Sequence, residues 1–167
     1  MISVWNRIRE RIRWIPRNIR IKYYKNRFKS CGDGLYIFGK VFINNPGNIV
    51  VGSNCRLNEG SKLICSAEST IILGDDVTLS QGASVISTGY DIRKWMCERD
   101  KKHLSCSNMI GDNVWLCTGA IVLPGVKITG PNVIIAAGAV VTKDILDSNC
   151  LYAGVPARKI KEYDFTN

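Results

Sequence analysis

The chain contains a single histidine, His103, within a polar stretch that interrupts an otherwise regular pattern of apolar residues. An imidazole ordinarily titrates near pH ~6.5, so it can accept the proton of a hydroxyl group at neutral pH. A lone histidine is also a common surface residue, and the neighbouring Lys101 and Lys102 favour that alternative. One histidine excludes a zinc site held by three imidazoles, and we expect no metal cofactor.

The cysteines form no recognisable framework. Their number is odd and no two of them stand in a CxxC spacing, which disfavours both a disulfide scaffold and a structural zinc site. We therefore expect buried free thiols. The seven positions are Cys31, Cys55, Cys65, Cys97, Cys106, Cys117 and Cys150.

The positive charge is concentrated at the N-terminus. Residues 1–30 hold ten Lys and Arg against one acid, Glu10, whereas the rest of the chain is neutral, with thirteen basic and thirteen acidic residues. Apolar residues recur there at spacings of three and four, which predicts an amphipathic helix, and Pro16 should kink it or begin a second helix. These apolar residues are Trp5, Ile8, Ile12, Ile15 and Ile19.

Three uses of this basic arm are open. It can bind an anionic membrane surface, pack against the rest of the protein, or bind nucleic acid. No recognition motif accompanies the charge, so we expect no nucleic-acid partner. No apolar run reaches the ~20 residues of a membrane span, and arginines replace the apolar part of a signal peptide. We expect a cytoplasmic protein, with peripheral contact at the inner face of the cytoplasmic membrane as one use of the arm.

From about residue 37 the apolar pattern has a period of six. The fifth position of each hexad is also small or apolar, as at Cys55, Ala83 and Ala120. A period of six fits neither a helix nor a hairpin, but it suits a three-sided coil whose successive turns pair as short parallel strands. The first positions of the hexads are Ile37, Ile43, Ile49, Val51, Leu57, Leu63, Leu73, Leu79, Val85, Ile110, Leu116, Val122, Ile128, Ile135 and Val141.

The sequence thus predicts an all-β solenoid with a short N-terminal helical arm and a protruding loop. We divide the chain into the arm (1–34), the hexapeptide-repeat domain (35–161) and a tail (162–167). The polar loop at 89–109 breaks the period and contains His103. A long loop in a compact repeat often carries function, although it can also be a tolerated insertion.

Three segments resemble the left-handed β-helix acyltransferases of the hexapeptide-repeat family: IGDNVWLCTGAIVLPG (110–125), AAGAVVTKDI (136–145) and AGVPARKI (153–160). The nearest branch is that of the galactoside, maltose and polysaccharide O-acetyltransferases. The resemblance covers about residues 35–161 and implies a left-handed parallel β-helix, a homotrimer and acetyl-CoA as co-substrate, bound in a groove between subunits.

The resemblance also implies which residues contact the coenzyme. Small residues would let its pantetheine arm approach the main chain, Trp115 would line the groove or serve only in packing, and three residues would bind the 3′-phosphate. The small residues are Gly119, Ala120, Ala137, Gly138 and Ala139. The phosphate ligands are Thr142, Lys143 and Arg158, and the alternative for Lys143 is a solvated surface charge.

The sequence departs from the family at the catalytic position. The family has a histidine at the start of the loop, where this chain has Tyr90. A phenol with a pKa near ~10 is a poor base at neutral pH. Either His103 acts as the base from the far end of the loop, or Asp91 does so with Tyr90 positioning the acceptor, or the activity is lost.

The function we expect is O-acetylation of a sugar hydroxyl, in a bacterial surface polysaccharide or its lipid-linked precursor. The alternatives are N-acetylation of an amino sugar on the same scaffold, where a free amine needs less help from a base, and a catalytically inactive trimer that binds coenzyme A or serves a structural role.

Overall fold

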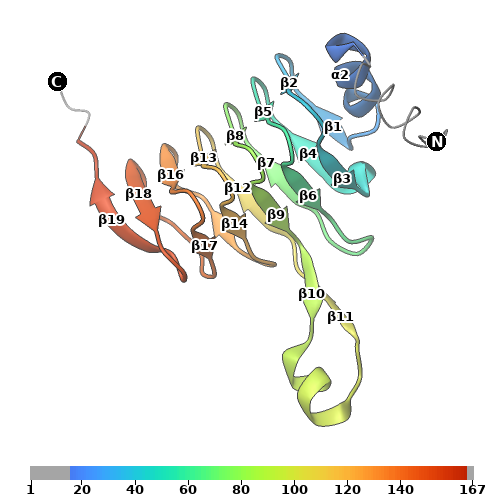
Figure 1. Cartoon of the computed structure of the whole chain (residues 1–167), viewed down its shortest axis with the longest axis vertical. Coiled ribbons are helices and arrows are strands. Elements are labelled where there is room, and N and C mark those ends of the chain that lie inside the picture. The colour runs from blue at the N-terminus through green and yellow to red at the C-terminus, as the bar shows by residue number, and fades with distance from the viewer. Residues whose placement is uncertain (1–15, 165–167) are drawn as a thin grey trace, which may run out of the picture.

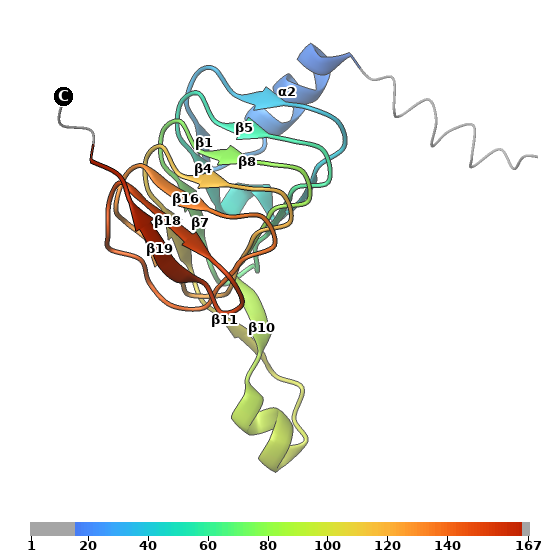
Figure 2. The same cartoon turned by 60° about the vertical axis from the view of Figure 1, so that its left-hand side comes forward.

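The computed structural model describes residues 16–164, and it confirms the predicted β-helix. The chain winds into a three-sided column from which one hairpin protrudes (Figures 1 and 2). The predicted helix face Trp5 to Ile15 lies outside the described residues.

Each side of the column is one sheet of parallel strands. Sheet A contains β1 (Ser30–Cys31), β4 (Ile49–Val51), β7 (Ile71–Leu73), β12 (Asn108–Ile110) and β15 (Lys127–Ile128). Sheet B contains β2 (Tyr36–Ile37), β5 (Arg56–Leu57), β8 (Thr78–Leu79), β13 (Trp115–Leu116), β16 (Val133–Ile135), β18 (Cys150–Ala153) and the antiparallel β19 (Arg158–Glu162). Sheet C contains β3 (Phe42–Asn44), β6 (Lys62–Ile64), β9 (Ser84–Ile86), β14 (Ile121–Val122) and β17 (Val140–Val141).

The core confirms the period of six. Every apolar residue at a first hexad position is buried except Ile43, which is partly buried and packs against the same core. The small residues at the fifth positions are buried as well, including Ala83 and Ala120. Strand register stacks these residues on their counterparts in the next coil, as Leu116 pairs with Ile135. Because each coil covers the one before it, the apolar column is continuous although no coil has a core of its own.

The corners of the column use left-handed backbone, and two of them use it differently. At the corner between sheets A and B, asparagine recurs at positive φ, and Asn113, Asn132 and Asn149 form a ladder of side-chain hydrogen bonds of 2.7 and 2.6 Å. At the corner between sheets B and C the positive-φ residue is glycine, as at Gly119 and Gly138. Glycine adopts this conformation without steric cost, so the B–C corner exposes bare main chain.

A helix closes the N-terminal end of the column. Helix α2 (Arg17–Lys25) begins directly after Pro16, which confirms that this proline starts a helix. Ile21 and Tyr24 pack against the core, whereas Ile19 is 59% exposed. The predicted apolar row therefore does not continue into the packed face of α2. Strand β1 lies inside the predicted arm (1–34), yet it already pairs with β4, so the first coil begins earlier than the predicted boundary at residue 35.

The seven cysteines lie within the described residues and all are free, as predicted. Cys55, Cys65 and Cys150 are buried in the core, and burial raises the pKa of the Cys55 thiol to about 11. The expectation of burial is wrong for Cys97, which is exposed on the protruding hairpin, where no core exists to cover it.

Candidate functional site

The hairpin that protrudes from the column carries the catalytic candidates. It leaves the corner between sheets C and A after β9 and returns to β12, which begins at Asn108, within the predicted loop. Its arms are β10 (Thr88–Tyr90) and the antiparallel β11 (His103–Ser105), and a π-helical turn, η2 (Lys94–Glu98), forms its tip. Cys106 N–H donates to the Ser87 carbonyl at 2.9 Å, which closes the base of the hairpin.

The hairpin places His103 directly opposite Tyr90. The two residues are cross-strand partners, and their ring centroids lie 4.5 Å apart with an angle of 36° between the planes. Both side chains are exposed. The far end of the loop thus brings an imidazole beside Tyr90, the residue that stands where the family pattern has its histidine, and the sequence alone did not show this pairing.

Asp91 has a different role in the hairpin. Its Oδ1 accepts the N–H of Lys94 at 3.1 Å, and its carbonyl accepts the N–H of Trp95 at 2.8 Å. The carboxylate therefore caps the turn at the tip, where the backbone N–H groups have no other partner in the turn. This geometry favours a structural role for Asp91.

A pocket at the C-terminal end of the column brings Lys143 and Arg158 together. Its volume is about 340 Å³, and Thr142 is exposed next to Lys143 but is not a lining residue. Among the described residues, neither Lys143 nor Arg158 forms an ion pair with an acid. Two cations without carboxylate partners suit an anionic ligand. The lining residues are Val141, Lys143, Asp144, Ile145, Tyr152, Ala157, Arg158 and Lys159.

The third cation of the pocket, Lys159, forms ion pairs with acids of the same chain. Lys159 Nζ lies 3.0 Å from a Glu162 oxygen and 3.5 Å from Asp147 Oδ1. The Tyr152 hydroxyl donates to Asp147 and lowers the pKa of that carboxyl, and Lys159 acts in the same direction. Burial, followed by the hydrogen bond to Asp147, raises the pKa of Tyr152. These contacts connect β18 and β19 to Asp147 in the preceding turn, and two of the residues that make them, Tyr152 and Lys159, line the pocket.

Trp115 lies on sheet B, away from the hairpin. Its indole N–H donates to Ser80 Oγ at 2.8 Å, and 46% of the residue is exposed. It lines a second pocket of about 360 Å³ together with Asn113, Asn132, Ile134 and Tyr163. Sequence reasoning missed Ser80 and Tyr163 because only the stacking of coils and the return of β19 bring them to this face.

The five small residues of the predicted coenzyme site lie at the B–C corner. Ala137 and Gly138 are exposed, and Gly119 is partly exposed. Ala120 and Ala139 are buried, and their N–H groups bond to Cys117 and Ala136 within their own turns. Only the first three residues therefore offer a surface to a ligand.

The predicted site residues form separate groups on one chain. The hairpin and Lys143 lie along the C–A corner, whereas the small residues lie along the B–C corner, at the other edge of sheet C. Trp115 lies beyond the B–C corner on sheet B. Neither of the two pockets described above joins the hairpin to the B–C corner.

Between residues 16 and 164, no three His, Cys, Asp or Glu side chains are grouped closely enough to hold a metal ion. None of the helices in the described part of the chain has the length and apolar character needed to cross a bilayer.

Similarity to known proteins agrees with this architecture. No protein-family model matches the chain. The galactoside O-acetyltransferase of Lactococcus lactis is 34% identical over 149 residues, covering 84% of this chain and 68% of that protein. The chain spans about two thirds of the length of the curated relatives it matches.

Comparison with solved structures also finds acetyltransferases that act on sugars, by their names. A maltose O-acetyltransferase from Clostridium difficile superposes with a TM-score of 0.80 at 29% identity, covering 90% of this chain and 78% of that one. A galactoside acetyltransferase in complex with coenzyme A superposes with a TM-score of 0.76 at 30% identity, covering 89% and 72%. The chain therefore belongs to the hexapeptide-repeat acyltransferases with a left-handed β-helix, in the branch of the galactoside and maltose O-acetyltransferases.

Proposed function

We propose that the protein transfers the acetyl group of acetyl-CoA to a hydroxyl group of a sugar. The observation that carries the proposal is the pocket in which Lys143 and Arg158 meet without carboxylate partners. Such a pair suits the 3′-phosphate of the coenzyme, and a solved relative was crystallised with coenzyme A. Thr142, exposed at the same corner, would add a hydroxyl donor.

His103 is the base in this proposal. Its imidazole removes the hydroxyl proton of the acceptor while the oxygen attacks the thioester carbonyl. The tetrahedral intermediate then expels the coenzyme thiolate, which takes the proton from the imidazolium, so that an ester and free coenzyme A are formed. Tyr90, 4.5 Å away by ring centroids, holds the imidazole by packing. Asp91 is occupied by the turn.

We propose that the protein acts as a homotrimer. On one chain the hairpin and the B–C corner flank opposite edges of sheet C. A second copy would bring its own hairpin to the exposed main chain at Gly119, Ala137 and Gly138. The acetyl-CoA groove would then lie between copies, with Trp115 as part of its wall.

An acetyl-transfer assay tests the function. The protein is incubated with acetyl-CoA and either methyl β-galactoside, maltose or glucosamine, and free thiol is followed with time. We expect thiol release with a hydroxyl acceptor and an acetyl ester as product. Release with glucosamine alone would indicate N-acetylation, and coenzyme binding without release would indicate an inactive trimer.

We further propose that the acceptor belongs to a bacterial surface polysaccharide or its lipid-linked precursor, at the inner face of the cytoplasmic membrane. The basic arm supports this, because ten of the first thirty residues are Lys or Arg. In α2, Ile19 and Tyr23 are 59% and 52% exposed and stand four residues apart, on one helix face. An apolar face flanked by cations suits an anionic lipid surface.

Sedimentation with lipid vesicles tests this contact. Each Lys or Arg near an anionic surface adds about 1 kcal/mol, so Arg11→Gln/Arg13→Gln should weaken binding to phosphatidylglycerol vesicles by roughly 30-fold. These substitutions lie outside α2, whereas removal of the arm would delete that helix. The control is Lys127→Gln, at the other end of the column. Equal sedimentation of both variants and the parent would contradict the proposal.

A further inference from the structure

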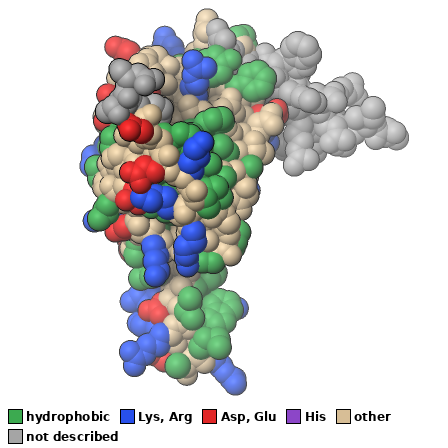
Figure 3. All heavy atoms as spheres, turned by 90° about the vertical axis from the view of Figure 1, so that its left-hand side faces the viewer, with side chains coloured by type: hydrophobic (Ala, Val, Ile, Leu, Met, Phe, Trp, Pro, Cys, Tyr) green, Lys and Arg blue, Asp and Glu red, His purple; other side chains and the backbone are tan. Residues whose placement is uncertain are grey.

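The protruding hairpin exposes large apolar side chains to an unusual degree. The exposed residues of this kind are Tyr90, Ile92, Trp95, Met96 and Leu104, all within one segment of the chain. In Figure 3, hydrophobic side chains gather on one flank of the hairpin, and Lys and Arg side chains lie on the other. Scattered exposed apolar residues need no explanation, but a contiguous apolar surface usually marks a binding site.

Three rings of this surface form a continuous series. The centroid of Trp95 lies 4.9 Å from that of Tyr90, which lies 4.5 Å from that of His103. Trp95 is still 42% exposed and Tyr90 47% exposed, so the rings pack against one another without being covered. The series thus leads from the tip of the hairpin directly to the imidazole.

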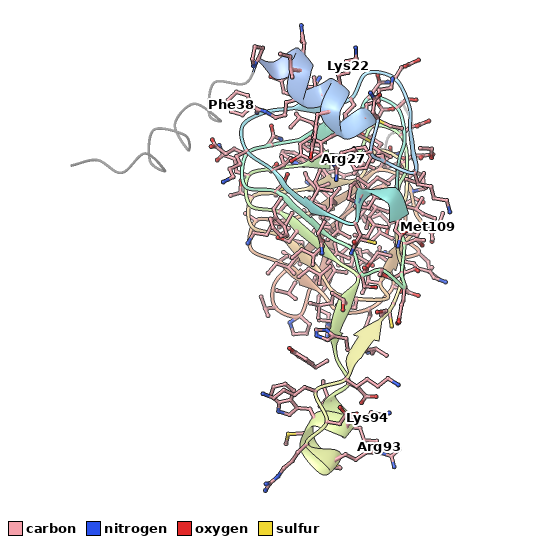
Figure 4. The ribbon with its side chains drawn as sticks, turned by 90° about the vertical axis from the view of Figure 1, so that its right-hand side faces the viewer. Lys22, Arg27, Phe38, Arg93, Lys94 and Met109 are labelled. Carbon is pink, nitrogen blue, oxygen red and sulfur yellow. The ribbon has the colours of Figure 1, made fainter. Side chains whose placement is uncertain are left out.

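The hairpin around this series has more cations than acids, namely Arg93, Lys94, Arg99, Lys101 and Lys102 against Asp91, Glu98 and Asp100. Lys101 Nζ lies 5.4 Å from the centroid of the Trp95 ring, which is within the range of a cation–π contact. Arg93 and Lys94 lie at the tip (Figure 4). Asp91, the acid nearest to Tyr90 in the chain, is engaged with the Lys94 N–H. Ammonium and guanidinium groups can donate hydrogen bonds to hydroxyl oxygens.

We propose that Trp95 and Tyr90 form the platform on which a pyranose ring of the acceptor stacks, a subsite that deepens the proposed function and rests on it. Aromatic faces carry negative partial charge and attract the C–H groups that line one face of a pyranose. Lys101, whose ammonium lies 5.4 Å from the centroid of the Trp95 ring, donates to hydroxyls of the bound sugar. A sugar stacked on Tyr90 presents a hydroxyl beside the imidazole of His103, which sets the acceptor for deprotonation.

Trp95→Ala tests the platform. We expect the KM for methyl β-galactoside to rise about tenfold, with the dissociation constant of acetyl-CoA unchanged by calorimetry. Trp95→Phe, which keeps a ring, should recover most of the loss. Cys97→Ala is the matched control, because Cys97 stands in the same turn and is exposed but carries no aromatic ring.

Binding is measured separately from turnover. Saturation-transfer NMR of methyl β-galactoside with the coenzyme A-loaded protein should give a signal that Trp95→Ala removes and Cys97→Ala retains. If that pattern appears without any acetyl transfer, the platform stands and the proposed reaction is wrong.

Two results overturn the platform. The first is an unchanged KM and an unchanged saturation-transfer signal in Trp95→Ala. The second is a lower oligomer mass of Trp95→Ala by light scattering, with sugar binding retained, which would make the surface an interface between copies of the chain.

Discussion

Substitution of His103 by alanine should lower kcat for acetyl transfer by about 10² to 10⁴, the usual contribution of a general base. The chain has no second histidine, so nothing of the same chemistry can replace it. Its loss removes the group that takes the hydroxyl proton, whereas the cations Lys143 and Arg158 remain in their pocket. The affinity for acetyl-CoA should therefore stay the same.

The measurement is thiol release at saturating acetyl-CoA, together with calorimetry of the coenzyme. Lys102→Ala is the matched control, because Lys102 precedes His103 in the hairpin, is exposed and should leave kcat unchanged. Asp91→Asn keeps an oxygen that can accept the Lys94 N–H and should also retain activity. Full activity of His103→Ala combined with a loss of activity in Asp91→Asn would reverse the assignment of the base.

The column was predictable from the sequence because its determinants are local. A coil of three hexads places a first-position residue such as Leu116 or Val122 in the core wherever the period holds. Insertions of one or two residues enlarge a corner and do not move a side chain out of the core. The β-helix could therefore be predicted although such insertions interrupt the six-residue period. The fifth position of each hexad is equally predictable, because a buried corner such as that of Ala120 accommodates only small or compact side chains.

The site was less predictable because it depends on pairings between distant residues. The facing of Tyr90 and His103 follows from the register of an antiparallel hairpin, and sequence pattern fixes a register only where one face is buried. Both faces of this hairpin are largely exposed. The pocket at Arg158 likewise requires β19 to fold back antiparallel on β18, with a register shift between Leu151 and Tyr152. The six-residue period of the sequence predicts neither this pairing nor its shift.

The structure also shows what asparagine contributes where it recurs at the A–B corner, and what glycine contributes at the B–C corner. Asparagine at the A–B corner tolerates positive φ and uses its side chain to bond the next coil, as Asn113 does to Asn132. Glycine at the B–C corner contributes no side chain, and a Cβ at Gly138 would meet nothing within 4 Å. The first corner thus adds stability to the column, and the second leaves open main chain where the proposed coenzyme groove lies.

The double substitution Lys143→Ala/Arg158→Ala should weaken the binding of acetyl-CoA by about 100-fold. A charge-assisted hydrogen bond to phosphate contributes at least about 1.4 kcal/mol, which is tenfold in affinity for each cation. Because Lys159 is held by Glu162 and Asp147, it cannot move to replace them without breaking its own ion pairs. Calorimetry with the intact coenzyme measures the loss.

Dephospho-coenzyme A, which lacks the 3′-phosphate, separates a direct contact from a general effect of charge. If both cations bind that phosphate, the unsubstituted protein should prefer the intact coenzyme, and the double variant should bind both forms equally. Lys161→Ala removes a nearby cation that does not line the pocket and should keep the preference. A double variant that still discriminates between the two forms would place the phosphate elsewhere, outside the pocket of Lys143 and Arg158.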